Sequence, residues 1–204
     1  MNVRLRYDMT LQAGIWYRSQ LKLNTYDIIL HFTTNTDSTE DHNIALDRIK
    51  YFVNDQLDST IFIHQDNTDQ IKALIEAGCS VTTLPEEPVD QIIGMMLFSK
   101  FNAIVDEYLK IVEVEVSSIL GGDVWYKHNF LESLGIFEEP GWWSQSNLLH
   151  VDIKKISRDV KVFKIIPDTD WQELDLHWST DQRPESADSE SSNVIFPDFT
   201  RNDN

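Results

Sequence analysis

Cysteine is almost absent from this sequence, which contains a single one, Cys79, in 204 residues. One cysteine cannot form a disulfide within the chain, and no group of cysteines and histidines has the spacing of a zinc site. Because stable disulfides are typical of oxidising compartments, their absence favours a protein of the cytosol.

Basic residues are also scarce. The chain has 17 lysines and arginines against 34 aspartates and glutamates, which gives a net charge of −17 and a pI near 4.5. Affinity for a nucleic-acid backbone comes from cations that displace counterions, so we exclude direct nucleic-acid binding. Three options remain: a protein kept apart from others by self-repulsion, a partner for basic surfaces, or a decoy for nucleic acid.

Long apolar runs are missing as well. The longest, residues 92–98, spans seven positions and is interrupted by Gly94, so it is too short to cross a bilayer. The basic start, residues 1–6, is not followed by an unbroken apolar run. We therefore expect neither a membrane span nor a signal peptide.

The sequence contains no nucleophile elbow, no phosphate-binding glycine loop and no HExxH helix. His31 and His64 lie near the ends of apolar segments and would form a metal site if Asp66 or Asp37 joined them. The alternative, which we favour, is that each histidine caps a strand end and bonds the backbone. We predict no metal and no cofactor.

Glu86, Glu87 and Asp90 form an acidic group at the start of a predicted helix. A carboxylate pair in a cleft can perform acid–base catalysis. Acidic residues in a first turn are more often the complement of the helix dipole, and we favour that interpretation. The sequence therefore predicts no catalytic residue, and we lean towards a protein that is not an enzyme.

Apolar periodicity predicts an ordered body, since 41% of the residues are hydrophobic. The predicted strands are residues 3–17, 26–34, 60–64, 79–84, 110–119, 124–128 and 160–166, and the predicted helices are residues 38–57, 66–77 and 88–108. Fifteen alternating residues are many for one strand, so we expect a bulge or bend near Gly14. The fold class is α+β, with mixed α/β as the alternative: one twisted sheet, three helices and a β-hairpin region towards the C-terminus.

We divide the chain into a folded acidic domain, residues 1–166, and an acidic, Ser-rich tail, residues 167–204. The tail holds ten carboxylates against two arginines and ends in an apolar segment, residues 194–199. Phe196 and Phe199 in that segment are candidates for docking into a hydrophobic groove of a partner. The alternative is that they fold back onto the chain's own domain.

Two further groups are candidates for partner binding. Glu113 and Glu115 share one face of a strand about 6.8 Å apart, and with Asp106 and Glu107 they would present a row of negative charge like that of a nucleic acid. The alternative is an ordinary solvated face. Five of the six tryptophans follow residue 124; Trp142 and Trp143 are either interface anchors or core residues, and we expect Trp125 in the core.

Three segments, Ile92 to Lys100, Val124 to His128 and Gly141-Trp142-Trp143, resemble uncharacterised proteins of large tailed bacteriophages of the T4-like group. The resemblance covers about the middle third of the chain. It implies a small non-enzymatic viral factor in the cytoplasm of a bacterial host. It carries no site residue over to this sequence.

Taken together, these features predict an acidic interaction protein, phage-encoded, that binds and modulates a host or viral protein with a basic surface. Mimicry of nucleic-acid charge is one form that such binding takes. The alternatives are a virion or assembly component, which would form a homo-oligomer, and an enzyme of unrecognised type.

Overall fold

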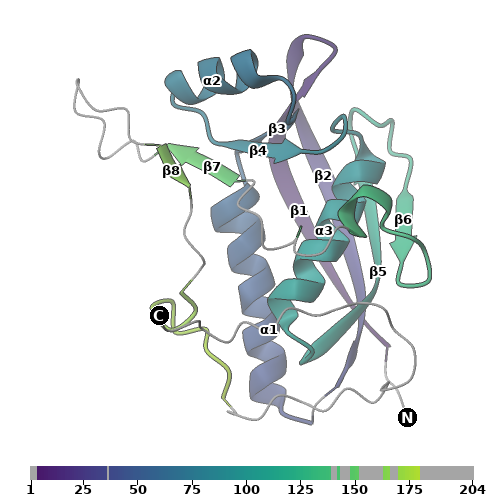
Figure 1. The fold of residues 1–204 in the computed structure, drawn as a ribbon. Coiled ribbons are helices and arrows are strands. Elements are labelled where there is room, and N and C mark those ends of the chain that lie inside the picture. Colours follow the sequence, from purple (N-terminus) through teal and green to yellow (C-terminus); the bar gives the residue numbers. More distant parts are fainter. Residues whose placement is uncertain are drawn as a thin grey trace.

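The centre of the sheet is a long antiparallel hairpin of β1 (Arg4–Tyr17) and β2 (Gln20–Thr34) (Figure 1). Its turn is formed by Arg18 and Ser19, which adopt positive φ values of 50° and 60°. Two successive left-handed residues give the tight turn whose twist matches that of paired strands. The computed structural model describes residues 4–35, 37–138, 142, 148–151, 163–165 and 170–179.

Of the predicted bulge or bend near Gly14, the bulge is wrong. The pairing of β1 with β2 runs without interruption from Arg4 opposite Thr33 to Tyr17 opposite Gln20. Gly14 instead marks the place where the next strand joins, since a Cβ there would lie 3.1 Å from Cγ1 of Ile61. The absence of a side chain at Gly14 leaves room for the side chain of Ile61 on the neighbouring strand.

The elements that follow agree closely with the predicted order. They are α1 (Thr39–Tyr51), which continues as a π-helical segment (Phe52–Leu57), then β3 (Ile61–His64), α2 (Thr68–Glu76), β4 (Val81–Leu84), α3 (Asp90–Val105), β5 (Leu109–Ser118), β6 (Tyr126–Asn129) and a short 3₁₀ helix (Gly135–Glu138). The side chain of Ser38 accepts a hydrogen bond from the backbone of Asp41 and so caps α1.

All the described strands belong to one mixed sheet, in the order β6-β5-β2-β1-β3-β4-β7-β8. β3 is parallel to both of its neighbours, β1 and β4. The other pairs of strands are antiparallel. β7 (Leu148–Val151) was not predicted, whereas β8 (Phe163–Ile165) lies inside the predicted strand at residues 160–166. The α+β class, the single sheet and the three helices are confirmed.

The helices leave part of the sheet open. α1 and α3 pack on one face, where the main core includes Ile28 and Leu30 of β2 and Met96 and Phe101 of α3 (Figure 1). α2 packs on the other face, over β3, β4 and β7, in a smaller cluster that includes Ile63 and, at the end of β1, Trp16. Over β2, β5, β6 and the rest of β1, that second face carries no helix among the described residues. We call this region the open face.

Residues 170–179, which belong to the predicted tail, lie against the domain. Arg48 of α1 is buried; its Nε donates to the carbonyl of Leu176 at 2.7 Å, and its guanidinium lies 3.7 Å from the ring centre of Trp178. The same ring stacks on Tyr108 at 3.9 Å. This part of the tail is therefore docked on its own domain. None of the helices in the described part is long and apolar enough to cross a membrane.

Candidate functional site on the open face of the sheet

Strand alternation places polar side chains in rows across the open face. Arg6, His31, Glu113 and Asn129 are cross-strand neighbours in one row. The next row contains Asp8, Ile29, Glu115 and Lys127. Side chains of neighbouring strands on one face lie close enough to interact directly.

A bulge between β2 and β5 lies just before the two glutamates, which share this face through the period-two alternation of β5. His31 is opposite Glu113, but Phe32 is opposite Ile111, so Val112 has no partner in β2. One extra residue in a strand shifts its alternation and redirects the side chains beyond it. The bulge therefore allows Ile111 and Val114 to point into the core while Glu113 and Glu115 both face outward.

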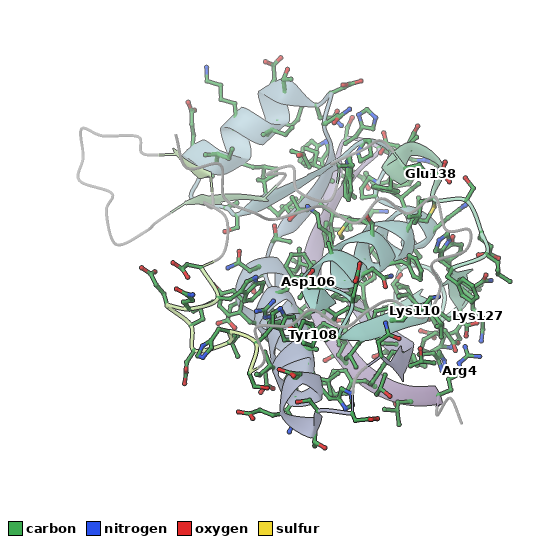
Figure 2. All side chains as sticks on the ribbon, turned by 60° about the horizontal axis from the view of Figure 1, so that its bottom comes forward. Arg4, Asp106, Tyr108, Lys110, Lys127 and Glu138 are labelled. Carbon is green, nitrogen blue, oxygen red and sulfur yellow. The ribbon has the colours of Figure 1, made fainter. Side chains whose placement is uncertain are left out.

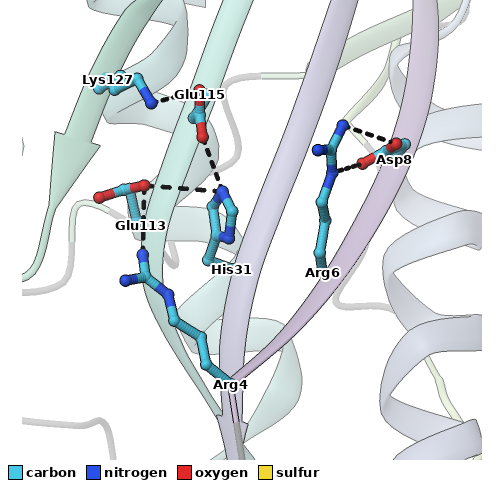
Figure 3. A network of polar contacts seen from close by, with 7 residues as sticks. All are labelled: Arg4, Arg6, Asp8, His31, Glu113, Glu115 and Lys127. Atoms are coloured by element: carbon cyan, nitrogen blue, oxygen red, sulfur yellow. Dashed lines mark hydrogen bonds and ion pairs between the residues drawn. The ribbon is translucent and has the colours of Figure 1, made fainter.

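Five residues form a connected set of ion pairs and hydrogen bonds, which we call the sheet-face network (Figure 3). Nε2 of His31 lies 2.7 Å from Oε1 of Glu115 and 3.6 Å from Oε1 of Glu113. Nζ of Lys127 lies 2.7 Å from Oε2 of Glu115, and Nη2 of Arg4 lies 3.2 Å from Oε1 of Glu113. Each carboxylate thus contacts His31 and one cation.

The network is partly withdrawn from water. The side chains of His31, Glu113 and Glu115 are 19%, 23% and 12% exposed. Burial alone would raise the pKa of Glu115, but the hydrogen bonds from Lys127 and His31 outweigh it and lower that pKa. Glu115 is therefore held as a carboxylate.

Arg6 and Asp8 form a separate ion pair on the same face (Figure 3), with Nε of Arg6 2.7 Å from Oδ1 of Asp8. Both side chains are more than half exposed. The open face thus carries cations and carboxylates side by side in a chain with a net charge of −17.

The prediction that Glu113 and Glu115 share one face is confirmed, but they are not a free row of negative charge because Arg4, His31 and Lys127 contact them. Asp106 and Glu107 lie in the turn after α3, both at positive φ. Asp106 lies well away from Arg4 and Lys127 (Figure 2) and accepts a hydrogen bond from Nε1 of Trp178 at 3.3 Å. The structure therefore does not bring the four acidic residues into one row.

The predicted tryptophan sites have different outcomes. Trp142 is 5% exposed and packs edge-on against Phe137, so it belongs to the core and does not offer its ring to a partner. Trp125 is 42% exposed, and its expected place in the core is wrong. Trp143, Phe196 and Phe199 lie outside the described residues.

The metal site considered as one interpretation of His31 and His64 does not form, because β1 lies between their two strands in the sheet. Nδ1 of His64 accepts a hydrogen bond from the backbone of Asp66, as in the alternative interpretation. Asp90 accepts a hydrogen bond from the hydroxyl of Ser118 at 2.8 Å, and burial raises its pKa. The partners of His31 come instead from β5, a strand that no local sequence signal connects to β2.

Comparisons with known proteins give similarity of fold only. No protein-family model matches this sequence, and no curated protein matches it. An uncharacterized protein from Wolinella succinogenes has a similar solved structure, with a TM-score of 0.50 and 10% identity over 64% of this chain and 99% of that one.

Two weaker structural matches are the 6-pyruvoyl tetrahydropterin synthases of Plasmodium vivax and Plasmodium falciparum. Their TM-scores are 0.43 and 0.41 and their identities 11% and 12%, over 64% and 63% of this chain and 99% of each of theirs. No residue role is transferred from any of these proteins. What the comparisons establish is that this chain has a fold similar to that of the Wolinella protein.

Proposed function

We propose that this protein is a non-catalytic interaction protein that binds an extended, basic segment of another protein along the edge strand β6. The observation that carries the proposal is the surface around this strand. β6 is the last strand of the sheet on its side, so its outward backbone groups have no strand partner among the described residues. The N–H and the carbonyl of Asn129 are bonded locally to Glu132, which leaves those of Lys127 for a strand from another chain. Such an edge is a template for a strand from another chain.

Exposed apolar side chains flank β6 in the chain on both sides. They are Ile119 (68%), Leu120 (47%), Val124 (69%), Trp125 (42%), Phe130 (51%) and Leu131 (81%). We call these residues the β6 patch. Large exposed apolar side chains are often found at binding sites, and tryptophan is enriched among the residues that contribute most to affinity.

The charge around the patch favours a basic occupant. Asp123 precedes Val124, Glu132 follows Leu131, and both are exposed. A basic segment would pair with these carboxylates and with the net charge of −17, whereas an acidic one would be repelled. The resemblance to phage proteins supports a host or viral partner in the bacterial cytoplasm. Mimicry of nucleic acid loses support, because Glu113 and Glu115 are already paired.

The test is capture of partners from a bacterial lysate with matched variants, followed by binding measurements on the purified pair. Leu131→Glu adds a charge to the β6 patch, whereas Leu23→Glu adds the same charge at another exposed leucine, in β2 (85% exposed). We expect the wild type and Leu23→Glu to bind one basic protein, and Leu131→Glu to lose it. We also expect this affinity to fall as salt rises.

Equal binding by both leucine variants would contradict the proposal. So would a bound partner that lacks an excess of basic residues. Light scattering on the purified protein tests the alternative of an assembly component. A dimer that Leu131→Glu dissociates would show that a second copy of the chain, and not a basic partner, occupies β6.

A further inference from the structure

We propose that His31, Glu113 and Glu115 bind one divalent transition-metal ion on the open face of the sheet. This site does not depend on the proposed partner, since it lies across β2 and β5 and not in the β6 patch. One ligand atom from each of the three side chains lies within 4.8 Å of the other two. No other group of this kind is found in the described part of the chain.

The distances are close to those of a coordinated ion. Ligand atoms about 2.0 Å from a tetrahedral metal are separated from one another by about 3.3 Å. Nε2 of His31 already lies 3.6 Å from Oε1 of Glu113 and 2.7 Å from Oε1 of Glu115. Small rotations of the side chains bring the three atoms to coordinating distances, while the paired strands hold their backbones in place.

The chemistry of the donors fits a divalent transition metal. One imidazole and two carboxylates suit zinc, iron or manganese, whereas calcium and magnesium prefer a set of oxygens alone. Three protein ligands on a partly exposed face leave further positions of the ion open to water. The two carboxylates would balance the charge of the ion.

The two cations of the network have different relations to this site. Lys127 contacts Oε2 of Glu115 and leaves Oε1 directed at His31, so it orients the ligand as a second-sphere partner does. Arg4 contacts Oε1 of Glu113, which is the atom that the ion needs. The side chain of Arg4 is 53% exposed and has room to swing away into solvent. Arg4 is therefore a competitor of the metal.

A network that only stabilises the sheet would contain the same contacts. Arg4→Gln removes one ion pair in either interpretation, so both expect a small loss of stability. Only the metal site also predicts tighter metal binding, by roughly three- to tenfold, because removal of the competing cation leaves Glu113 free. The metal affinity of this variant therefore distinguishes a metal site from an ion-pair network.

The experiment uses the full chain, treated with a chelator and dialysed. Calorimetry with Zn²⁺ should report one site per chain, and Co²⁺ should give the visible absorption of a bound, low-symmetry ion. His31→Gln and Glu115→Gln should each weaken Zn²⁺ binding at least tenfold. Asp8→Asn is the matched control, because Asp8 lies on the same face but contacts Arg6 instead of the proposed ligands.

Circular dichroism of the metal-free variants shows whether each one is folded. Because there are two ligand variants, the test remains possible if one of them fails to fold. No saturable binding of Zn²⁺ or Co²⁺ at micromolar concentration would overturn the site. Equal affinities of the wild type and both ligand variants would do the same, because the ion would then bind elsewhere. Weaker binding by Arg4→Gln would also overturn it.

Discussion

Lys100 of α3 is 8% exposed, an unusual position for an ammonium group. Burial lowers its pKa from 10.5 to about 8, because the charged form loses its hydration. Its Nζ lies 4.9 Å from the ring centre of Trp142, whose π-electrons attract the charge. Apolar residues surround Lys100 on more than one side of α3, a pattern typical of a buried helix, so the helix carries the lysine into the core with it.

The first prediction concerns Lys100→Met. A lysine whose pKa is lower in the folded state binds fewer protons there than when unfolded, so stability rises with pH between about 8 and 10.5. Below that range the folded protein holds a buried charge, which methionine removes. Relative to the wild type, the variant should therefore be favoured more at pH 7 than at pH 10.5, by up to about 3 kcal/mol.

Urea unfolding of both proteins at several pH values checks this expectation. The difference in the free energy of unfolding should shrink as pH rises from about 8 towards 10.5. Other groups titrate in both proteins and cancel in the difference. A difference that stays constant with pH would show that Lys100 keeps its charge in the fold.

At the scale of single elements, periodicity alone indicated most of the helices and strands. Period-two alternation predicted β1 and β5, and the predicted helix at residues 38–57 matches the start of α1 at Thr39. The β1–β2 hairpin was missed because Arg18 and Ser19 form its turn without the glycine or asparagine that usually marks one. The tertiary pairing of two long strands, and not a local preference, places them at positive φ.

Gly94 in the middle of α3 shows how an element adapts to its neighbour. A Cβ at this position would lie 2.8 Å from Cδ1 of Tyr126 on β6. Glycine inside a helix costs about 1 kcal/mol relative to alanine. The close approach of helix and strand is therefore obtained at the expense of local helix stability.

The second prediction concerns Gly94→Ala. Helix propensity alone would make this substitution stabilising, but the overlap with Tyr126 should make it destabilising by roughly 1–3 kcal/mol. In a Tyr126→Ala background the overlap is gone, and the same substitution should then stabilise by up to about 1 kcal/mol. A double-mutant cycle of urea unfolding measures both effects. A stabilising Gly94→Ala in the wild-type background would be incompatible with this packing.

At the scale of the whole molecule, local sequence patterns do not predict which strands become neighbours. Alternation predicted that Glu113 and Glu115 share a face, but the histidine between them comes from β2, and His31 is 84 residues away from Glu115. The docking of residues 170–179 also depends on distant groups, since Arg48 and Leu176 are 128 residues apart. Contacts of this kind follow from the topology, which local patterns leave open.

The net charge of −17 makes electrostatic self-repulsion a property of the whole chain. Salt screens this repulsion, because the Debye length falls from about 30 Å at 0.01 M to about 8 Å at 0.15 M. Within the ion pairs of the open face, the charged atoms lie only 2.7 Å and 3.2 Å apart, far less than either Debye length. Screening should therefore weaken the repulsion more than the attraction.

The third prediction is that the free energy of unfolding rises, on the order of 1 kcal/mol, between 0.01 and 0.15 M NaCl. Urea is the denaturant for this measurement, since guanidinium would itself supply the salt. The double variant Glu86→Gln, Glu87→Gln carries two fewer negative charges and should gain less from salt than the wild type does. A fall in stability with salt would instead mean that attraction within the sheet-face network and the Arg6–Asp8 pair outweighs the repulsion among the remaining acidic groups.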